Sequence, residues 1–173
     1  MHTMVRTFQG KTPTCEAGVW IADSAEVIGD VRLGRDASVG YQTLTRGDVS
    51  QGSIGRRSHV PDTTTTHASR DHGPTIIGND VTLGHRVVAH GCRIDDGALI
   101  GIGSVLLDHS VVEGGAMVAA MSLLAPGTVV PAGMLAMGQP AKVVREVSSE
   151  ERRWMVETIS NYVALARLHA RSE

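Results

Sequence analysis

The chain has 173 residues, of which 42% are hydrophobic and 20% are charged, and its formal net charge is -2. This length and hydrophobic fraction allow one domain with a continuous core, while the near-balanced charge argues against a nucleic-acid-binding surface. Arg6 and Lys11 interrupt the N-terminus, and no apolar run is long enough to cross a membrane. Cys15 and Cys92 lie far apart. We therefore predict a cytoplasmic protein without disulfides, and no membrane or nucleic-acid partner.

Aliphatic or small residues recur every six positions along most of the chain. The recurring positions are Ile21, Val27, Leu33, Val39, Thr45, Ile54, Val60, Thr66, Ile77, Leu83, Ala89, Ile94, Ile100, Leu106, Val112, Val118, Leu124 and Val130. This period fits neither a helix nor a long strand. It predicts a parallel β-helix of about six coils, in which three hexapeptides make one triangular coil. The recurring residue points inward, and the Gly or Asp that often follows takes the corner.

Two histidines occupy the same position of the repeat. His67 follows the inward residue Thr66, and His90 follows the inward residue Ala89. If residues 68–75 form an extruded loop, these histidines lie one full coil apart and stack on one face, about 4.8 Å from each other. Two imidazoles at this spacing can bind one metal ion.

A third histidine, His85, falls two residues after Leu83 and therefore on the preceding face of the prism. It cannot easily reach the same metal within one chain, but the His85 of a second prism packed alongside can. The repeat thus predicts an intersubunit site. The same heterologous contact repeated around a closed ring favours a homotrimer with three sites.

The C-terminal stretch breaks the repeat. Ser148 and Glu151 form a capping box, and apolar residues then recur at helical spacing at Met155, Ile159, Tyr162, Val163 and Ala166. We predict a β-helix with its N-terminal lead-in over residues 1–147 and a helix over residues 148–173, both in one domain. This helix packs along its own prism or reaches a neighbouring subunit. His169 is interpreted as a solvated surface side chain.

Six motifs between Trp20 and Tyr162 follow one another in a characteristic order. They are Arg46-Gly47-Asp48, Thr65-Thr66-His67, Gly73-Pro74-Thr75-Ile76-Ile77-Gly78, Gly84-His85, His90-Gly91-Cys92 and, near the end of the repeats, Gly138-Gln139-Pro140-Ala141-Lys142. In order and spacing they resemble the gamma-class carbonic anhydrases and their shorter bacterial relatives. The resemblance implies a left-handed β-helix, and a homotrimer in which His67, His85 and His90 bind zinc at each interface. Iron or cobalt are the alternative metals.

The resemblance also implies roles for four further residues. Arg46 and Asp48 match a pair that forms intersubunit contacts near the metal, although a local salt bridge at a corner is the simpler alternative. Asp62 matches a carboxylate close to the first metal ligand. Tyr162 matches a tyrosine that approaches the neighbouring metal site, and packing of the terminal helix is the alternative for it.

Two departures from the family pattern affect the chemistry. The family carries an Asn-x-Gln-Asp run where this chain has residues 59–62, so that His59 replaces the Asn and Pro61 replaces the Gln. The Gln orients the metal-bound hydroxide, and proline has no side-chain donor. The acidic loop with a proton-shuttle Glu is also absent, which leaves His72 or His59 as a relay that titrates near neutrality.

The resemblance implies reversible hydration of CO2 to bicarbonate by a metal-bound hydroxide, and the missing Gln predicts that this reaction is slow. Two alternatives stay open. One is an acyl-CoA thioesterase or hexapeptide acyltransferase, since such transferases share the coil and form trimers. The other is a metal-binding scaffold without catalysis.

Overall fold

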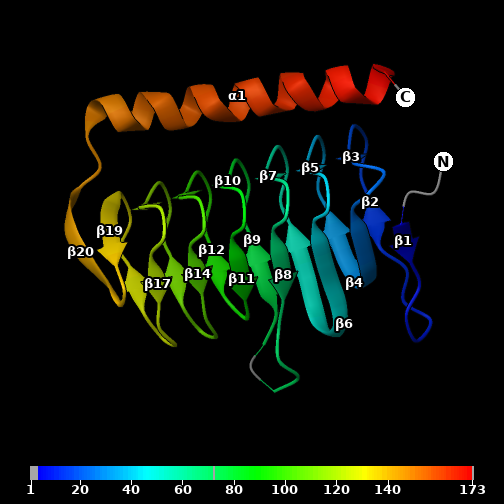
Figure 1. The fold of residues 1–173 in the computed structure, drawn as a ribbon, viewed down its shortest axis with the longest axis horizontal. Helices are drawn as coiled ribbons and strands as arrows, with labels where there is room; N and C mark the ends of the chain where they lie inside the picture. The colour runs from blue at the N-terminus through cyan, green and yellow to red at the C-terminus, as the bar shows by residue number, and fades with distance from the viewer. Residues whose placement is uncertain (1–3, 72, 173) are drawn as a thin grey trace.

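The computed structural model describes residues 4–71 and 73–172, which form a parallel β-helix of about seven turns with one C-terminal helix (Figure 1). The fold class predicted from the six-residue period is therefore confirmed. No helix in the described part of the chain is both long and apolar enough to span a membrane.

The strands stack into three faces, each of which contains one strand per turn. The first face consists of β1 (Met4–Arg6), the first parts of β4 (Glu26–Leu33) and β6 (Leu44–Ile54), β8 (Thr65–His67), β11 (Val88–His90), β14 (Val105–Leu106) and β17 (Leu123–Leu124). The second face consists of β2 (Thr14–Cys15), the second parts of β4 and β6, β9 (Thr75–Ile77), β12 (Arg93–Ile94), β15 (Val111–Val112) and β18 (Val129–Val130). The third face consists of β3 (Trp20–Ile21), β5 (Ser38–Val39), β7 (His59–Val60), β10 (Thr82–Leu83), β13 (Leu99–Ile100), β16 (Met117–Val118) and β19 (Met134–Gly138), to which β20 (Ala141–Glu146) adds antiparallel.

The N-terminal lead-in supplies part of a turn that the repeat did not predict. Val5 of β1 pairs with Val27, and Cys15 of β2 pairs with Leu33. These two strands therefore extend the first and second faces by one position each. The segment between them has no six-residue period, which is why counting repeats found about six coils.

The interior is a column of the recurring residues. One turn contributes Ile100, Leu106 and Val112, one from each face, and all three are fully buried. The glycine after an inward residue permits close approach of successive turns. A Cβ on Gly84 would lie 2.5 Å from the backbone nitrogen of Ile102 in the next turn, closer than two such atoms can pack.

All three departures from the six-residue spacing fall at one corner, between the first and second faces. The inward positions are separated by nine residues from Thr45 to Ile54, by eleven from Thr66 to Ile77, and by five from Ala89 to Ile94. The strands on either side stay in register. The irregular corner therefore occupies three consecutive turns, directly beside His67 and His90.

The C-terminal helix α1 (Ser149–Ser172) runs along the third face, as Figure 1 shows, and contacts β3, β5, β7 and β10. Its N-terminus has the predicted capping box, because the Ser148 N–H donates to Glu151 and the Glu151 N–H donates to the Ser148 hydroxyl. Met155, Ile159 and Ala166 are buried. The helix thus packs on its own prism, which was one of the two predicted arrangements.

Candidate metal centre

His67 and His90 lie side by side on the first face. They are paired residues at the ends of β8 and β11, as the repeat predicted. Thr66 and Ala89 beside them point into the core. The centroids of the two imidazole rings are 5.4 Å apart, close to the spacing of adjacent strands. Both rings therefore project from the prism at neighbouring positions.

Each of these imidazoles contacts a carboxylate. His90 Nδ1 lies 2.7 Å from Asp108 Oδ1, and His67 Nε2 lies 3.0 Å from Asp48 Oδ1. Arg46 holds the other oxygen of Asp48 through Nε at 3.1 Å and through Nη2. Burial opposes the charged form of Asp48, but the hydrogen bond and charge of Arg46, together with the contact with His67, outweigh burial and lower the Asp48 pKa. Asp48 is therefore ionised, and the local salt bridge that we considered for this pair is present.

Backbone contacts fix the two histidines at the irregular corner. The Thr75 hydroxyl donates to the carbonyl of His67 and accepts from the Gly91 N–H at 2.9 Å. Gly91 has a φ of +54°, and a Cβ there would lie 2.1 Å from Asp108 Oδ1. A side chain at position 91 would therefore displace the Asp108 carboxylate that contacts His90.

His85 occupies a separate place, at the corner between the third and first faces. Its Nδ1 lies 3.7 Å from Asp62 Oδ2, and its side chain is 47% exposed. Asp62 is itself held by the backbone N–H of Tyr41, which donates to Asp62 Oδ1 at 2.8 Å. His85 is thus the third histidine with a carboxylate beside it, and it faces away from the prism.

His59 lies under α1 and stacks on Tyr162, with ring centroids 3.9 Å apart and an interplanar angle of 17°. Its Nδ1 is 2.7 Å from the Ser38 hydroxyl. Burial lowers the pKa of His59 to about 4. Burial therefore keeps His59 neutral at physiological pH, which weighs against a proton relay that titrates near neutrality. The other candidate for this role, His72, lies outside the described residues.

A cluster near the end of α1 escaped the sequence reasoning. His169 stacks on Trp20 at 4.8 Å and its Nδ1 lies 3.2 Å from the hydroxyl of Tyr41. The interpretation of His169 as a solvated side chain is therefore wrong. These three residues line one cavity of about 190 Å³ together with His85 and Asp62. Because the chain has few aromatic residues, Trp20 and Tyr41 were the features of the sequence that could have indicated this cluster.

The sequence reasoning also missed Asp108, although the position of this residue follows from the repeat. Ala89 pairs with Leu106, so the residue opposite His90 is Leu107 and Asp108 follows it. Extending the strand register by one turn would have placed this carboxylate beside His90.

One chain carries two separate halves of a site. His67 and His90 with their carboxylates lie on the first face. His85 and Asp62 lie at the corner between the third and first faces, and His59 and Tyr162 stack where α1 covers the third face. Within the described residues of one chain, no three His, Cys, Asp or Glu side chains are grouped so that they can hold a metal ion. The chemistry of the donors nevertheless fits a metal, because an imidazole that donates one ring N–H to a carboxylate presents a lone pair on its other nitrogen.

Comparisons with known proteins add the following findings. No family model matches the chain. The chain is 40% identical, over 98% of its length, to a protein of Arabidopsis thaliana named gamma carbonic anhydrase 2, mitochondrial, of which it spans 62%. A protein of Geobacillus kaustophilus named carbonic anhydrase is 40% identical over 92% of the chain and 87% of its own length. A solved Bacillus cereus structure, provisionally named an acetyltransferase, is 38% identical with a TM-score of 0.96 and covers 98% of both chains.

Proposed function

The chain belongs to the gamma-class carbonic anhydrase family, and from this premise we propose that it catalyses the reversible hydration of CO2 to bicarbonate. The observation that carries the proposal is the pair of in-register imidazoles, His67 and His90, each held by a carboxylate. Such carboxylate–histidine pairs orient the imidazoles that bind catalytic metals. The cytoplasmic location stays a prediction, since one relative is named mitochondrial.

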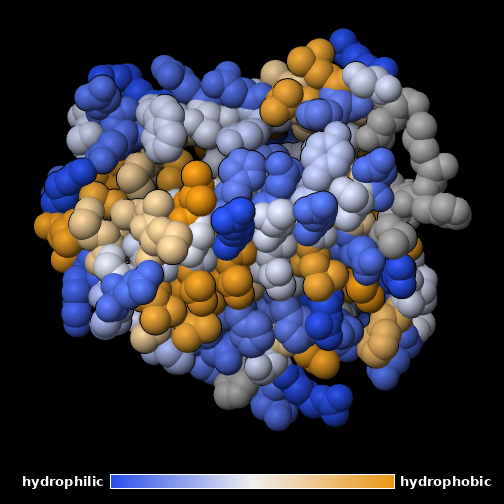
Figure 2. Space-filling model, in the orientation of Figure 1, coloured by the Kyte–Doolittle hydropathy of each residue, from blue (hydrophilic) through white to orange (hydrophobic). Residues whose placement is uncertain are grey.

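The active protein is a homotrimer in this proposal. Each metal is bound by His67 and His90 of one chain and by His85 of the next. The reason is that His85 lies at the corner between the third and first faces, away from the His67 and His90 of its own chain. In the next turn of the prism, the corner position that corresponds to His85 is occupied by Ile102, which is apolar and 53% exposed. Figure 2 shows further apolar side chains on the viewed face below α1. An exposed apolar corner beside a polar half-site supports contact with another copy of the chain.

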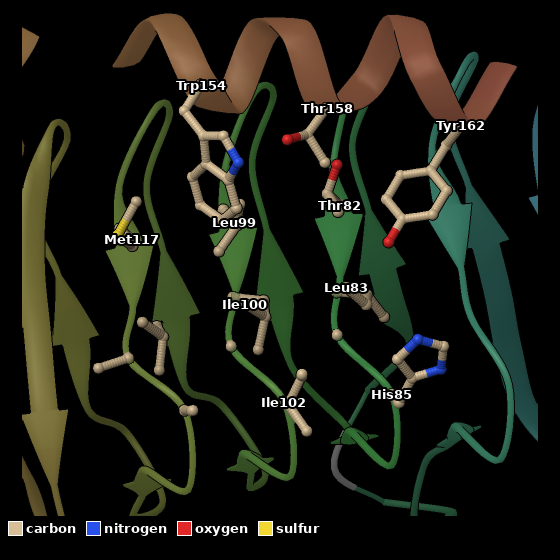
Figure 3. Close-up of a pocket in the computed structure, with 15 residues that line it drawn as sticks. Thr82, Leu83, His85, Leu99, Ile100, Ile102, Met117, Trp154, Thr158 and Tyr162 are labelled. Atoms are coloured by element: carbon tan, nitrogen blue, oxygen red, sulfur yellow. The ribbon is translucent and has the colours of Figure 1, made fainter. Parts of the chain in front are cut away.

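Zinc would fit this set of imidazole donors, with iron or cobalt as alternatives, and it would supply a Lewis acid that activates water for attack on CO2. Asp62 orients His85, and Arg46 keeps Asp48 ionised beside His67. Tyr162 on α1 and His85 on the prism line the same cavity (Figure 3), where the Tyr162 hydroxyl can contact a small substrate.

The acyl-CoA alternative rests on a different catalytic arrangement. Hexapeptide acyltransferases typically use one catalytic histidine, whereas this chain pairs three histidines with three carboxylates. The provisional name of the Bacillus cereus relative keeps the alternative worth assaying. Acyl-CoA hydrolysis should therefore be measured beside CO2 hydration on the same preparations.

The decisive experiment is metal analysis of mixed variants. We expect His85→Ala and His67→Ala each to lose the bound metal, while His109→Asn, at an exposed corner position, keeps it. Refolding the two alanine variants together in equal amounts should restore about a quarter of the metal and of the CO2 hydration rate, because an interface then combines an intact His85 with an intact His67 at random. If the mixture stays as empty as the separate variants, the ligands come from one chain and the intersubunit proposal is wrong.

A further inference from the structure

A row of polar residues leads away from His85 along the corner between the third and first faces. Tyr41, Asp62 and His85 occupy the equivalent corner position in three successive turns, because the strands before them, β5, β7 and β10, are in register. Successive strands of the prism lie about 4.8 Å apart, so the row covers about 10 Å from His85 to Tyr41. The row therefore runs from a candidate metal ligand toward the N-terminal end of the prism.

Contacts connect the members of the row to each other and, at the far end, to the C-terminal helix. Asp62 lies 3.7 Å from Nδ1 of His85 and accepts a hydrogen bond from the Tyr41 N–H at 2.8 Å. The Tyr41 hydroxyl lies 3.2 Å from Nδ1 of His169 on α1. His169 is therefore the imidazole at the outer end of the row, away from the three candidate metal ligands.

Contacts on both sides of the third face hold the end of α1 that carries His169. The His169 ring stacks on Trp20, with ring centroids 4.8 Å apart and an interplanar angle of 19°. At the opposite corner of this face, Arg167 donates a hydrogen bond to Asp36 at 3.2 Å. The imidazole of His169 is thus fixed in position, while the residue stays partly exposed to solvent.

One cavity of about 190 Å³ is lined by all four of these side chains, those of His85, Asp62, Tyr41 and His169. A space of this size has room for several water molecules, which need polar groups as partners. The row supplies a carboxylate, a hydroxyl and two imidazoles. His59 lines the same cavity but is only 9% exposed, so it cannot pass a proton directly to the solvent. The partly exposed His169 can.

We propose that His169 is the proton relay of the CO2 hydration reaction, an inference that rests on the proposed function. One CO2 and one water give bicarbonate and one proton, which has to leave the site before the next reaction. The proton passes through the water of the cavity, along Asp62 and Tyr41, to Nδ1 of His169. The protonated ring then gives a proton to a buffer base in the solvent. Imidazole suits both steps because it gains and loses a proton near neutral pH.

Exchange of oxygen-18 between labelled bicarbonate and water, measured on the metal-loaded protein, separates the chemical step from the proton step. The interconversion of CO2 and bicarbonate reports the chemical step at equilibrium. The release of labelled water needs a proton delivered to the site, so it reports the relay running in reverse. The main variant is His169→Phe, whose ring can still stack on Trp20 but cannot carry a proton. His109→Asn is the exposed control.

We expect His169→Phe to release labelled water about tenfold or more slowly than the wild type at low buffer concentration. The interconversion of CO2 and bicarbonate should not change. A high concentration of HEPES should restore the release, because a soluble base then replaces the missing imidazole. Tyr41→Phe, which lacks the hydroxyl beside His169, should show a smaller loss of the same kind, and His109→Asn should behave as the wild type.

A measurement on the metal-free protein tests the relay without catalysis. A relay has to hold the proton in passing. Nitrogen-15 spectra of protein with labelled histidine should therefore show the His169 ring changing between its neutral and protonated forms over the pH range of the exchange assay. A ring that keeps one form throughout this range would contradict the proposal.

Three exchange results would overturn the proposal. If His169→Phe releases labelled water as fast as the wild type, the proton leaves by another route, which a loss in His72→Asn would identify. A loss that HEPES does not restore, or an equal fall in both rates, means that the substitution disturbs the site itself and not the transfer of protons. If the wild type does not interconvert CO2 and bicarbonate at all, the proposed function fails and the relay fails with it.

Discussion

His59 should make the stability of the protein depend on pH, and His59→Phe should remove that dependence. Phenylalanine keeps a flat ring against Tyr162 but cannot be protonated. His59 is 9% exposed, and burial lowers its pKa from 6.5 to about 4. The unfolded chain therefore binds a proton at this residue between pH 6.5 and about pH 4, where the folded chain does not.

The sign and size of the effect follow from this difference. The unfolded state binds more protons in that window, so the free energy of unfolding falls as the pH falls through the unfolded pKa. The full shift corresponds to about 3 kcal/mol. Lowering the pH from about 7.5 to about 5 should remove about 2 kcal/mol of stability through His59 alone.

The assay is urea unfolding at these two pH values for the wild type, for His59→Phe and for His109→Asn as an exposed control. The wild type and the control should lose about 2 kcal/mol more than His59→Phe on acidification. Equal losses in all three proteins would refute the reasoning, since they would mean that His59 accepts a proton in the folded state.

Three further predictions concern the two halves of the site. Asp108→Asn keeps an acceptor beside His90 but removes its charge, and should weaken metal binding about 10- to 100-fold in competition with a chromogenic chelator; unchanged affinity would exclude a positioning role. Gly91→Ala should lower the unfolding midpoint and the metal affinity together, because the new Cβ would lie 2.1 Å from the Asp108 carboxylate. Pro61→Gln combined with His59→Asn should raise the CO2 hydration rate on the order of 10²-fold at constant metal content in stopped-flow assays, and a double variant no faster than the wild type would show that Pro61 does not limit the rate.

The register of the site could be predicted by counting. A solenoid repeats the same contacts in every turn, so the position of one inward residue fixes the positions of the others. For this reason the pairing of His67 with His90, and the placement of His85 on another face, followed from the sequence. The extra turn at the N-terminus did not, because the pairing of Val5 with Val27 joins segments that share no repeat.

The environments of individual side chains were harder to predict, because they depend on what the helix covers. The repeat shows that His59 points outward from the third face, where a solvated imidazole would be expected. Helix α1 covers this position with Tyr162 and excludes water from the ring. His169 is packed for the same reason, since the far end of the helix brings it against Trp20. Helical spacing within the C-terminal segment indicates which residues are apolar, but it does not say which turn of the prism each one meets.

At the irregular corner, the sequence of this protein can change in length without disturbing the neighbouring strands. The connection between His67 and Thr75 leaves the prism and returns to it, while the Thr75 hydroxyl ties its two ends together and β9 resumes pairing with β6. A change in the length of this connection therefore does not shift the strands on either side, whereas one inserted residue on a regular face would turn every following side chain away from its neighbour. The segment is a natural place for insertion or grafting, and acidic or imidazole side chains could be introduced there beside His67 without moving it.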